Sequence, residues 1–329
     1  MQRSRIVGTG TYLPARKVTN DDLVKEFGIN TTDAWIRERT GIGARRIAAP
    51  DEATSDMATA ASRKALEMAG IAPAELDMIV VGTVTPDMPF PSAAVLVQAK
   101  MGAKKAVCFD VSAACAGSLY ALSIADSFVR GGSAKKVLVI GAELLTRISD
   151  WKDRATCVLF GDAAGAMVVV PETRPDRGIL SIHLYTDGTQ ADILKIPGGG
   201  SQKPFSPDVW EKREQFIKMN GREVYKTAVR VLEAASREAL QRNGYQPKDV
   251  DYVIAHQANL RILDAVMKRL EIPLEKCEVN IDQVGNTSSA SVPLTLDQAN
   301  RAGKLKDGDL ILMMAIGGGM AWGSALMRW

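Results

Sequence analysis

The sequence predicts an α/β protein made of two duplicated halves, and two observations carry this prediction. The first is an internal repeat: Ser62 opens SRKALEMAGIAPAELDMIVVG and Ser236 opens SREALQRNGYQPKDVDYVIAH, an offset of 236 − 62 = 174 residues in a chain of 329. The second is a series of short apolar runs that do not alternate with polar residues, namely MIVV, VLVI, AMVVV, YVIA and LILMM. Such runs are typical of strands that helices cover on both faces.

Each copy of the repeat has the same order of predicted elements: a helix, a glycine that ends it, a turn with a proline, and a buried strand. At the same offset, AACAGSLYALSIA from Ala113 falls on TSSASVPLTLDQA from Thr287. We therefore expect two halves, 1–172 and 173–329, packed as a pseudo-twofold pair. The stretch from about Pro171 to Asn220 breaks the pattern with prolines and three successive glycines, and we interpret it as a linker or an excursion over a site between the halves.

Composition excludes several classes of protein. The longest apolar run, Leu310 to Ile316, is far shorter than the roughly 18 residues that span a membrane. The first ten residues lack the apolar stretch of a secretory signal, so we expect a cytoplasmic protein without a membrane partner. A net charge of +3 does not indicate a nucleic-acid partner. Four cysteines without CxxC spacing and two histidines do not indicate a metal cluster.

Cys115 is the candidate nucleophile. It lies in CFDVSAACAGSLYALSIADSF, where a predicted strand ends and helical spacing begins near Ala116. A helix N-terminus carries partial positive charge, so we expect it to lower the pKa of the thiol. The alternative is a small core residue, which is how we interpret the other three cysteines (Cys108, Cys157 and Cys277).

His256 and Asn286 are the candidate partners of Cys115. His256 ends the strand of the second repeat, and in open α/β sheets ligands bind beyond the carboxyl ends of strands. We interpret the other histidine, His183, as structural. Asn286 lies in the duplicated counterpart of the Cys115 turn, although Gly285–Asn286 alone would be an ordinary turn. The glycines 317–319 follow a buried strand, and their N–H groups could bind an oxyanion or merely form a tight turn.

A cysteine, a histidine and an asparagine in this order fit two chemistries. In a papain-type protease the histidine would deprotonate the thiol, but the flanking CGSCW signature is absent and the chain is a duplicated α/β protein. In a thioester condensation the cysteine would carry an acyl group, while the histidine and asparagine donate hydrogen bonds to an enolate formed by loss of CO2 from a malonyl thioester. That chemistry requires no metal or redox cofactor, and we expect none.

Eight motifs in order, spread over the whole chain, carry a family resemblance: IVGTGTYLP, WIRERTGI, FPSAA, DVSAACAG, FGDAAGA, HQANLRI, GNTSSASVP and GGGMAWGSAL. The sequence resembles the type III β-ketoacyl-acyl-carrier-protein synthases, which initiate bacterial fatty-acid synthesis. The resemblance implies a thiolase fold, five layers in the order αβαβα with mixed sheets, in a homodimer. It also implies an acyltransferase that condenses a short acyl-CoA primer with malonyl-acyl carrier protein.

The resemblance further implies roles for individual residues. Cys115, His256 and Asn286 would be the catalytic triad, and the N–H groups of Cys115 and Gly318 the oxyanion hole. Coenzyme A and the acyl group would contact Thr31, Trp35, Arg39, Phe90, Arg154 and Asn259, with Phe90 reaching across the dimer interface. The acidic carrier protein would contact Lys226, Gln257, Arg261 and Lys268.

The chain departs from the family pattern beside the glycine triplet. Ile316 stands where the family commonly has Phe, and Met320 and Ala321 stand where Leu or Phe and Thr are usual. These changes bear on malonyl handling and pocket shape. Phe90, Met88 and Leu159 suggest a partly filled pocket and hence a short primer. A condensing enzyme of secondary metabolism with a different primer and an inactive thiolase-fold scaffold also fit the same motifs.

Overall fold

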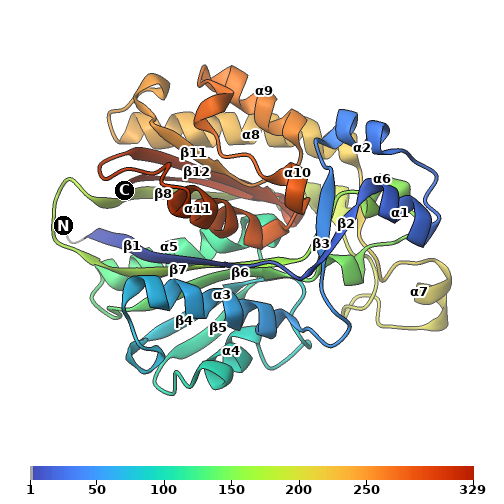
Figure 1. Cartoon of the computed structure of the whole chain (residues 1–329), viewed down its shortest axis with the longest axis horizontal. Helices are drawn as coiled ribbons and strands as arrows, with labels where there is room; N and C mark the ends of the chain where they lie inside the picture. Colours follow the sequence, from blue (N-terminus) through green and yellow to red (C-terminus); the bar gives the residue numbers. More distant parts are fainter. Residues whose placement is uncertain (1–2) are drawn as a thin grey trace.

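The computed structural model describes residues 3–329, in which two open sheets alternate with three layers of helices (Figure 1). The first sheet has the strand order β1 (Arg3–Tyr12), β7 (Ala163–Glu172), β6 (Val137–Glu143), β4 (Met78–Gly82) and β5 (Val107–Val111). It is mixed, because β4 runs parallel to both β5 and β6, whereas β7 runs antiparallel to β6 and to β1.

The second sheet repeats this plan with fewer strands. Its order is β11 (Tyr252–Ala255), β12 (Leu310–Gly317), β13 (Ala321–Arg328) and β8 (Gly178–Thr186). β11 and β12 are parallel, and the other two pairs are antiparallel. The predicted division at 172/173 falls in the connection between β7 and β8.

Helices cover both faces of each sheet, as the non-alternating apolar runs predicted. α3 (Thr54–Ala69) and α4 (Ala93–Met101) pack on the outer face of the first sheet, and α8 (Gly221–Arg242) and α9 (Leu260–Leu270) on the outer face of the second. α5 (Gly117–Arg130) and α11 (Ser291–Arg301) lie between the sheets and share one apolar core with both (Figure 1). The order of layers is αβαβα, which confirms the predicted fold class.

The repeat folds as its sequence predicted. α3 ends at Gly70, which adopts a left-handed conformation (φ 64°) and donates its N–H to the last turn. The chain then turns through η1 (Pro73–Glu75) into the buried strand β4. In the second copy α8 is followed by Gly244 (φ 75°), η5 (Pro247–Asp249) and β11.

The interpretation of 171–220 as linker or excursion is wrong for its first part, because β8 is a full strand of the second sheet. Its half-buried residues do not form one of the uninterrupted apolar runs from which we inferred strands. The remainder leaves the sheet and crosses over the site, through η4 (Gly188–Ile193), β9 (Leu194–Lys195), α7 (Pro207–Glu211) and β10 (Lys218–Met219).

A cap of short elements completes the molecule beside the strand ends (Figure 1). These elements pack around one apolar cluster that includes the fully buried Ile36. They are β2 (Arg16–Thr19), α1 (Asn20–Phe27), α2 (Asp33–Thr40), β3 (Ala44–Ile47), η3 (Leu145–Ile148), α6 (Arg154–Cys157) and α10 (Ile281–Val284). None of the helices within residues 3–329 is long and apolar enough to cross a bilayer.

Candidate active site

Cys115 sits on a strained turn between strand β5 and helix α5. It is the middle residue of η2 (Ala114–Ala116), and α5 begins two residues later at Gly117. Ala114 has φ 43°, a left-handed conformation that costs a non-glycine residue about 1–3 kcal/mol. The turn presents the sulfur beside the N-terminus of a helix in the central layer, where it is almost completely buried.

The second half contains the same turn without a cysteine. η7 (Ser288–Ala290) leads into α11, and Ser288 has φ 48°. The 174-residue offset of the repeat relates Ser288 to Ala114. Asn286 precedes this turn and is fixed by it, because its Oδ1 accepts a hydrogen bond from the Ser288 N–H (2.9 Å). Its Nδ2 group is therefore left to donate elsewhere.

His256 directly follows strand β11 and is almost fully buried. Its backbone N–H donates to the Met314 carbonyl (2.8 Å), whereas neither ring nitrogen has a hydrogen-bond partner within residues 3–329. Burial lowers the pKa of His256 to about 3, since a charged imidazolium would lose its hydration here. The imidazole is neutral at physiological pH and has one N–H group to offer a ligand.

One cavity of about 810 Å³ brings these three side chains together. Cys115 reaches it from the first half of the chain, and His256 and Asn286 reach it from the second. Apolar residues form much of the remaining wall: Val158, Leu159, Phe160, Leu194, Met219, Val224, Ile262, Ile316 and Met320. Two of the residues that depart from the family pattern, Ile316 and Met320, thus line the cavity itself.

The glycine triplet lies against Cys115. A Cβ atom added to Gly317 would stand 2.4 Å from the Cys115 nitrogen and 2.9 Å from the Ala113 oxygen. Only a residue without a side chain allows β12 to end so close to this turn. Gly318, whose N–H is the other predicted oxyanion donor, directly follows this contact and opens η8 (Gly318–Met320).

The prediction that the helix N-terminus lowers the pKa of Cys115 is wrong in direction. Burial raises the pKa of the thiol to about 12, and the nearby Glu143 carboxylate raises it further. The nearby Ser288 side chain acts in the opposite sense and does not compensate. The reason is desolvation: the packing of the two halves removes the sulfur from water, which the sequence did not indicate.

Trp35 marks the entrance of the cavity and is held between two guanidinium groups. The Arg39 and Arg154 guanidinium carbons lie 4.8 and 4.7 Å from the indole ring centre. Arg154 also donates to the Asn30 carbonyl (2.9 Å), and Asn259 donates to the Arg39 carbonyl (3.1 Å). Trp35, Arg39 and Asn259 line the cavity, whereas Arg154 borders it through Trp35.

Thr31 belongs to the same region but does not line this cavity. Its hydroxyl is buried and has no hydrogen-bond partner within the described chain.

Four basic side chains surround the mouth, including two of the predicted carrier-protein contacts. Arg39, Arg222, Lys226 and Arg261 come from α2, α8 and α9. Arg222 was not predicted from the sequence, because it has no distinctive motif around it. Lys268 lies further along α9 and pairs with Asp264 (2.7 Å).

The prediction that Gln257 contacts a carrier protein is wrong. Gln257 is fully buried, and its side-chain amide donates to the Ala255 and Glu278 carbonyls (3.1 and 2.9 Å). Its oxygen accepts from the Asn280 N–H (3.2 Å). With these hydrogen bonds the side chain joins β11 to the following loops and presents nothing to the surface.

Phe90 and Met88 do not reach the cavity within one chain. Phe90 is 84% exposed and Met88 is 43% exposed, and neither lines it. Leu159, the third residue from which we predicted a short primer, does line it. The predicted role of Phe90 therefore requires a second copy of the chain.

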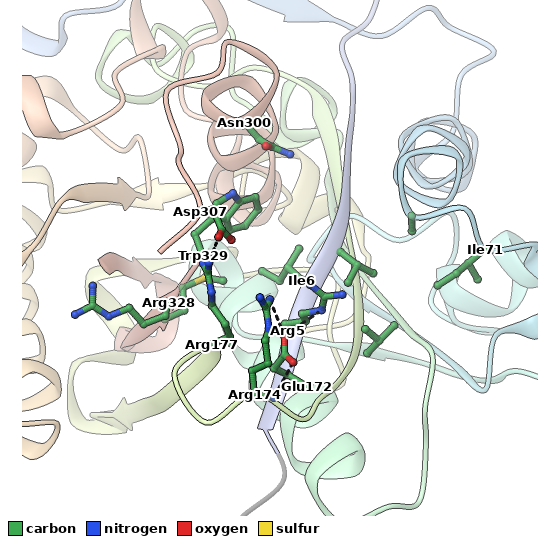
Figure 2. A pocket seen from close by; sticks show the side chains of 15 residues that line it. Arg5, Ile6, Ile71, Glu172, Arg174, Arg177, Asn300, Asp307, Arg328 and Trp329 are labelled. Atoms are coloured by element: carbon green, nitrogen blue, oxygen red, sulfur yellow. Dashed lines mark hydrogen bonds and ion pairs between the residues drawn. The ribbon is translucent and has the colours of Figure 1, made fainter. Parts of the chain in front are cut away.

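A second cavity, of about 600 Å³, lies at the opposite end of the strands (Figure 2). β7 runs antiparallel to β6, so Glu172 stands near the start of β6 and Glu143 at its end. Glu172 pairs with Arg5 (3.3 Å) and Arg174 (3.4 Å), and Arg177 pairs with Asp307. The residues that line this cavity include no cysteine or histidine, so it is not the candidate active site.

Comparison with known proteins places the chain among condensing enzymes. Two family models match it: "3-Oxoacyl-[acyl-carrier-protein (ACP)] synthase III" over residues 109–188 and the C-terminal model of the same family over 240–329. The β-ketoacyl-[acyl-carrier-protein] synthase III of Xanthomonas campestris pv. campestris is 52% identical over 326 residues, covering 99% of this chain and 98% of that protein.

Solved structures give the same result. The 3-oxoacyl-[acyl-carrier-protein] synthase III of Aquifex aeolicus is 48% identical, with a TM-score of 0.92 over 99% of this chain and 100% of that one. The priming β-ketosynthase of the R1128 polyketide pathway is 40% identical, with a TM-score of 0.91 over 99% of this chain and 96% of that one.

Proposed function

The chain belongs to the 3-oxoacyl-[acyl-carrier-protein] synthase III family, whose members are acyltransferases, and we propose that it condenses a short acyl-CoA primer with malonyl-acyl carrier protein. The product is a 3-ketoacyl-acyl carrier protein, and the reaction initiates fatty-acid synthesis. The observation that carries this proposal is the single cavity that contains Cys115, a neutral His256 and Asn286.

In the first step the Cys115 sulfur attacks the thioester carbonyl of the primer, and coenzyme A leaves. The N–H groups of Cys115 and Gly318 stabilise the oxyanion, an interaction worth roughly 3 kcal/mol per donor in other acyl-transfer enzymes. The close approach of Gly317 to the Cys115 nitrogen supports this pair of donors. Trp35, Arg39, Arg154, Thr31 and Asn259 would receive coenzyme A at the entrance.

In the second step the malonyl thioester loses CO2, and the enolate carbon attacks the acyl group on Cys115. The enolate oxygen needs donors that keep their protons. A neutral His256 and the Nδ2 group of Asn286 meet this need, because Oδ1 of Asn286 is already occupied by Ser288. The reaction as a whole neither oxidises nor reduces its substrates, so we expect no redox cofactor.

The experiment that tests this proposal supplies acetyl-CoA and malonyl-acyl carrier protein. We expect CO2 release, a 3-ketoacyl product and a transient mass increase of one acetyl group on the peptide with Cys115. The Cys115→Ala variant should lose the acyl mass and the product. Absence of both CO2 and acyl-Cys115 in the wild-type protein would contradict the enzyme proposal and favour the inactive scaffold.

The partners follow from the surfaces around the cavity. Arg39, Arg222, Lys226 and Arg261 form a basic rim that suits an acidic carrier protein. The exposed Phe90 and the free edge of strand β5 support a homodimer, because a second copy would cover both.

A second candidate function is the priming condensation of a polyketide pathway. The observation that favours it is the 40% identity to the R1128 priming β-ketosynthase. A panel of acyl-CoA primers distinguishes the two functions, since preference for acetyl-CoA supports fatty-acid initiation. Equal turnover of acetyl and dodecanoyl primers would contradict the short-primer prediction. A papain-type protease does not fit, because the chain has the αβαβα layers of condensing enzymes.

A further inference from the structure

Glu143 is a buried carboxylate beside the active site to which the two steps above assign no role. It is the last residue of strand β6 and has no exposed surface. One oxygen, Oε2, is fully engaged: it accepts from the Thr85 hydroxyl (2.7 Å), the Val84 N–H (3.1 Å) and the Thr83 hydroxyl (3.3 Å). Within residues 3–329 the other oxygen, Oε1, accepts only from the Ser288 hydroxyl (3.0 Å).

Ser288 connects this carboxylate to the nucleophile. Its hydroxyl donates to Glu143 (3.0 Å), and its side chain lies close enough to the Cys115 thiol to lower the pKa of that thiol. Its backbone is left-handed (φ 48°), and its N–H donates to Oδ1 of Asn286 (2.9 Å). The Ser288 side chain thus lies next to both the Cys115 thiol and the Glu143 carboxylate, and all three residues are buried.

Acylation requires the sulfur to give up its proton, and because Cys115 is almost completely buried, a proton acceptor close to it is needed. His256 does not fit the role of base, since burial makes its ring a very poor proton acceptor. Glu143, whose charge acts on the thiol and whose Oε1 accepts from the Ser288 hydroxyl, is a proton acceptor close to Cys115.

We propose that Glu143 accepts the proton of the Cys115 thiol through the Ser288 hydroxyl during acylation and returns it when condensation releases the sulfur. This inference rests on the proposed condensation. It assigns Glu143 and Ser288 to the acylation of Cys115, whereas His256 and Asn286 act on the malonyl thioester.

Bonds and protons balance over the cycle. As the Cys115 sulfur bonds to the acyl carbon, its proton passes to the Ser288 oxygen and the Ser288 proton passes to Oε1 of Glu143. The bond from acyl carbon to coenzyme A breaks, and the coenzyme A thiolate takes a proton from solvent. When the enolate carbon later bonds to the acyl carbon, the bond to Cys115 breaks and the thiolate regains its proton from Glu143 along the same path.

The environment of Glu143 suits a group that changes protonation state near neutral pH. Burial raises its pKa to about 7, partly offset by the hydrogen bonds from Thr85, Val84, Ser288 and Thr83. The titratable group that faces it is Cys115 itself. A carboxylate that is easily protonated is a useful temporary acceptor for a thiol proton.

The test separates acylation from decarboxylation in the full-length protein. Single-turnover acylation of Cys115 by acetyl-CoA is followed by mass spectrometry between pH 5.5 and 9, and CO2 release from malonyl-acyl carrier protein is followed without primer. In Glu143→Gln the amide oxygen can keep the Thr85 and Val84 hydrogen bonds, while its NH2 group faces Ser288 and cannot take a proton. We expect acylation to slow at least tenfold and to lose its inflection near pH 7, with CO2 release within twofold of wild type.

Two further variants decide between a proton path and a structural role. Ser288→Ala should slow acylation like Glu143→Gln, and it provides the test if Glu143→Gln does not fold. Ser289→Ala is the matched control, because it removes a neighbouring buried hydroxyl that has no hydrogen-bond partner within residues 3–329, and both rates should stay at wild-type values.

Wild-type acylation rates and an unchanged pH profile in Glu143→Gln would overturn the inference. Equal losses of acylation and CO2 release in both variants would also overturn it, because they indicate general damage to the site. A wild-type protein that forms neither acyl-Cys115 nor CO2 would instead contradict the proposed function.

Discussion

At the scale of single residues, burial shifts the pKa values of Cys115 and His256 in opposite directions. It raises the pKa of Cys115 to about 12 and lowers that of His256 to about 3, because in both cases it disfavours the charged form. The result is a neutral thiol beside a neutral imidazole. An ion pair of thiolate and imidazolium, on which a papain-type reaction depends, is therefore disfavoured in this cavity.

His256 also makes the stability of the fold depend on pH. Between the unfolded pKa of about 6.5 and the folded pKa of about 3, the unfolded chain binds a proton that the folded chain does not, so stability falls as pH falls. We expect wild type to lose about 2 kcal/mol more unfolding free energy than His256→Gln between pH 7 and pH 5. Urea unfolding of both proteins at the two pH values measures this difference. If both proteins lose the same unfolding free energy, His256 is charged in the folded state at pH 5.

Trp35 offers a residue-scale test of the entrance. Replacing it with alanine removes the surface on which Arg39 and Arg154 stack, so both guanidinium groups lose their fixed positions. We expect Trp35→Ala to raise KM for acetyl-CoA about tenfold and to change kcat less than threefold. Trp210→Ala is the control, because Trp210 is 58% exposed on α7 and does not line the cavity. Steady-state kinetics with varied acetyl-CoA give both values, and an unchanged KM would exclude Trp35 from the coenzyme A site.

At the scale of elements, the site depends on how closely the end of β12 approaches the turn before α5. The two strained turns, at Ala114 and Ser288, present Cys115 from one half and fix Asn286 in the other. Gly317 is the contact between the end of β12 and the nucleophile turn. A substitution of Gly317 should therefore lower the rate of the reaction while leaving the rest of the fold intact.

Gly317→Ala tests this contact. The new Cβ would overlap the Cys115 nitrogen, so the turn must shift away from the oxyanion position. We expect kcat to fall at least a hundredfold, in line with the loss of one oxyanion donor. Gly188→Ala is the matched control, since nothing lies within 4 Å of a Cβ at that position. Acylation of Cys115 and circular dichroism of both variants are the measurements, and a fully active Gly317→Ala would refute the close approach.

At the scale of the whole molecule, the first sheet ends in an edge strand that a monomer leaves uncovered. β5 is the last strand of the sheet, and its first residue, Val107, is 59% exposed. Free apolar edges are sites of association, and the edge strand leads directly to the nucleophile turn. A dimer formed through β5 would therefore stabilise the strand that carries Cys115.

The oligomeric state can be measured by sedimentation velocity. We expect the wild type to be a dimer at micromolar concentration and Val107→Glu to shift it toward monomer, because the charge would be buried at the interface. Phe205→Glu is the control, since Phe205 is 63% exposed on the excursion, far along the chain from β5. A wild-type monomer at these concentrations would contradict both the dimer and the role of Phe90 in the partner's pocket.

The sequence by itself determined the duplicated architecture and the candidate residues of the cavity. The repeat of 174 residues and the non-alternating apolar runs predicted two duplicated α/β halves with helices on both faces of their strands, because local periodicity and turn chemistry are encoded in neighbouring residues. The αβαβα order of layers was an expectation from the family resemblance. They also indicated Cys115, His256 and Asn286, since each follows an apolar strand or stands in its duplicated counterpart.

Only the tertiary structure decided the electrostatics and the supporting contacts. The pKa values of Cys115 and His256, the burial of Gln257 and the hydrogen bonds of Glu143 all depend on which surfaces the two halves remove from water. Desolvation arises from residues far apart in the sequence, so no local motif indicates it. That is why the sequence predicted an acidic thiol at a helix end, whereas the packed molecule contains a neutral one beside Ser288, whose hydroxyl donates to a buried carboxylate.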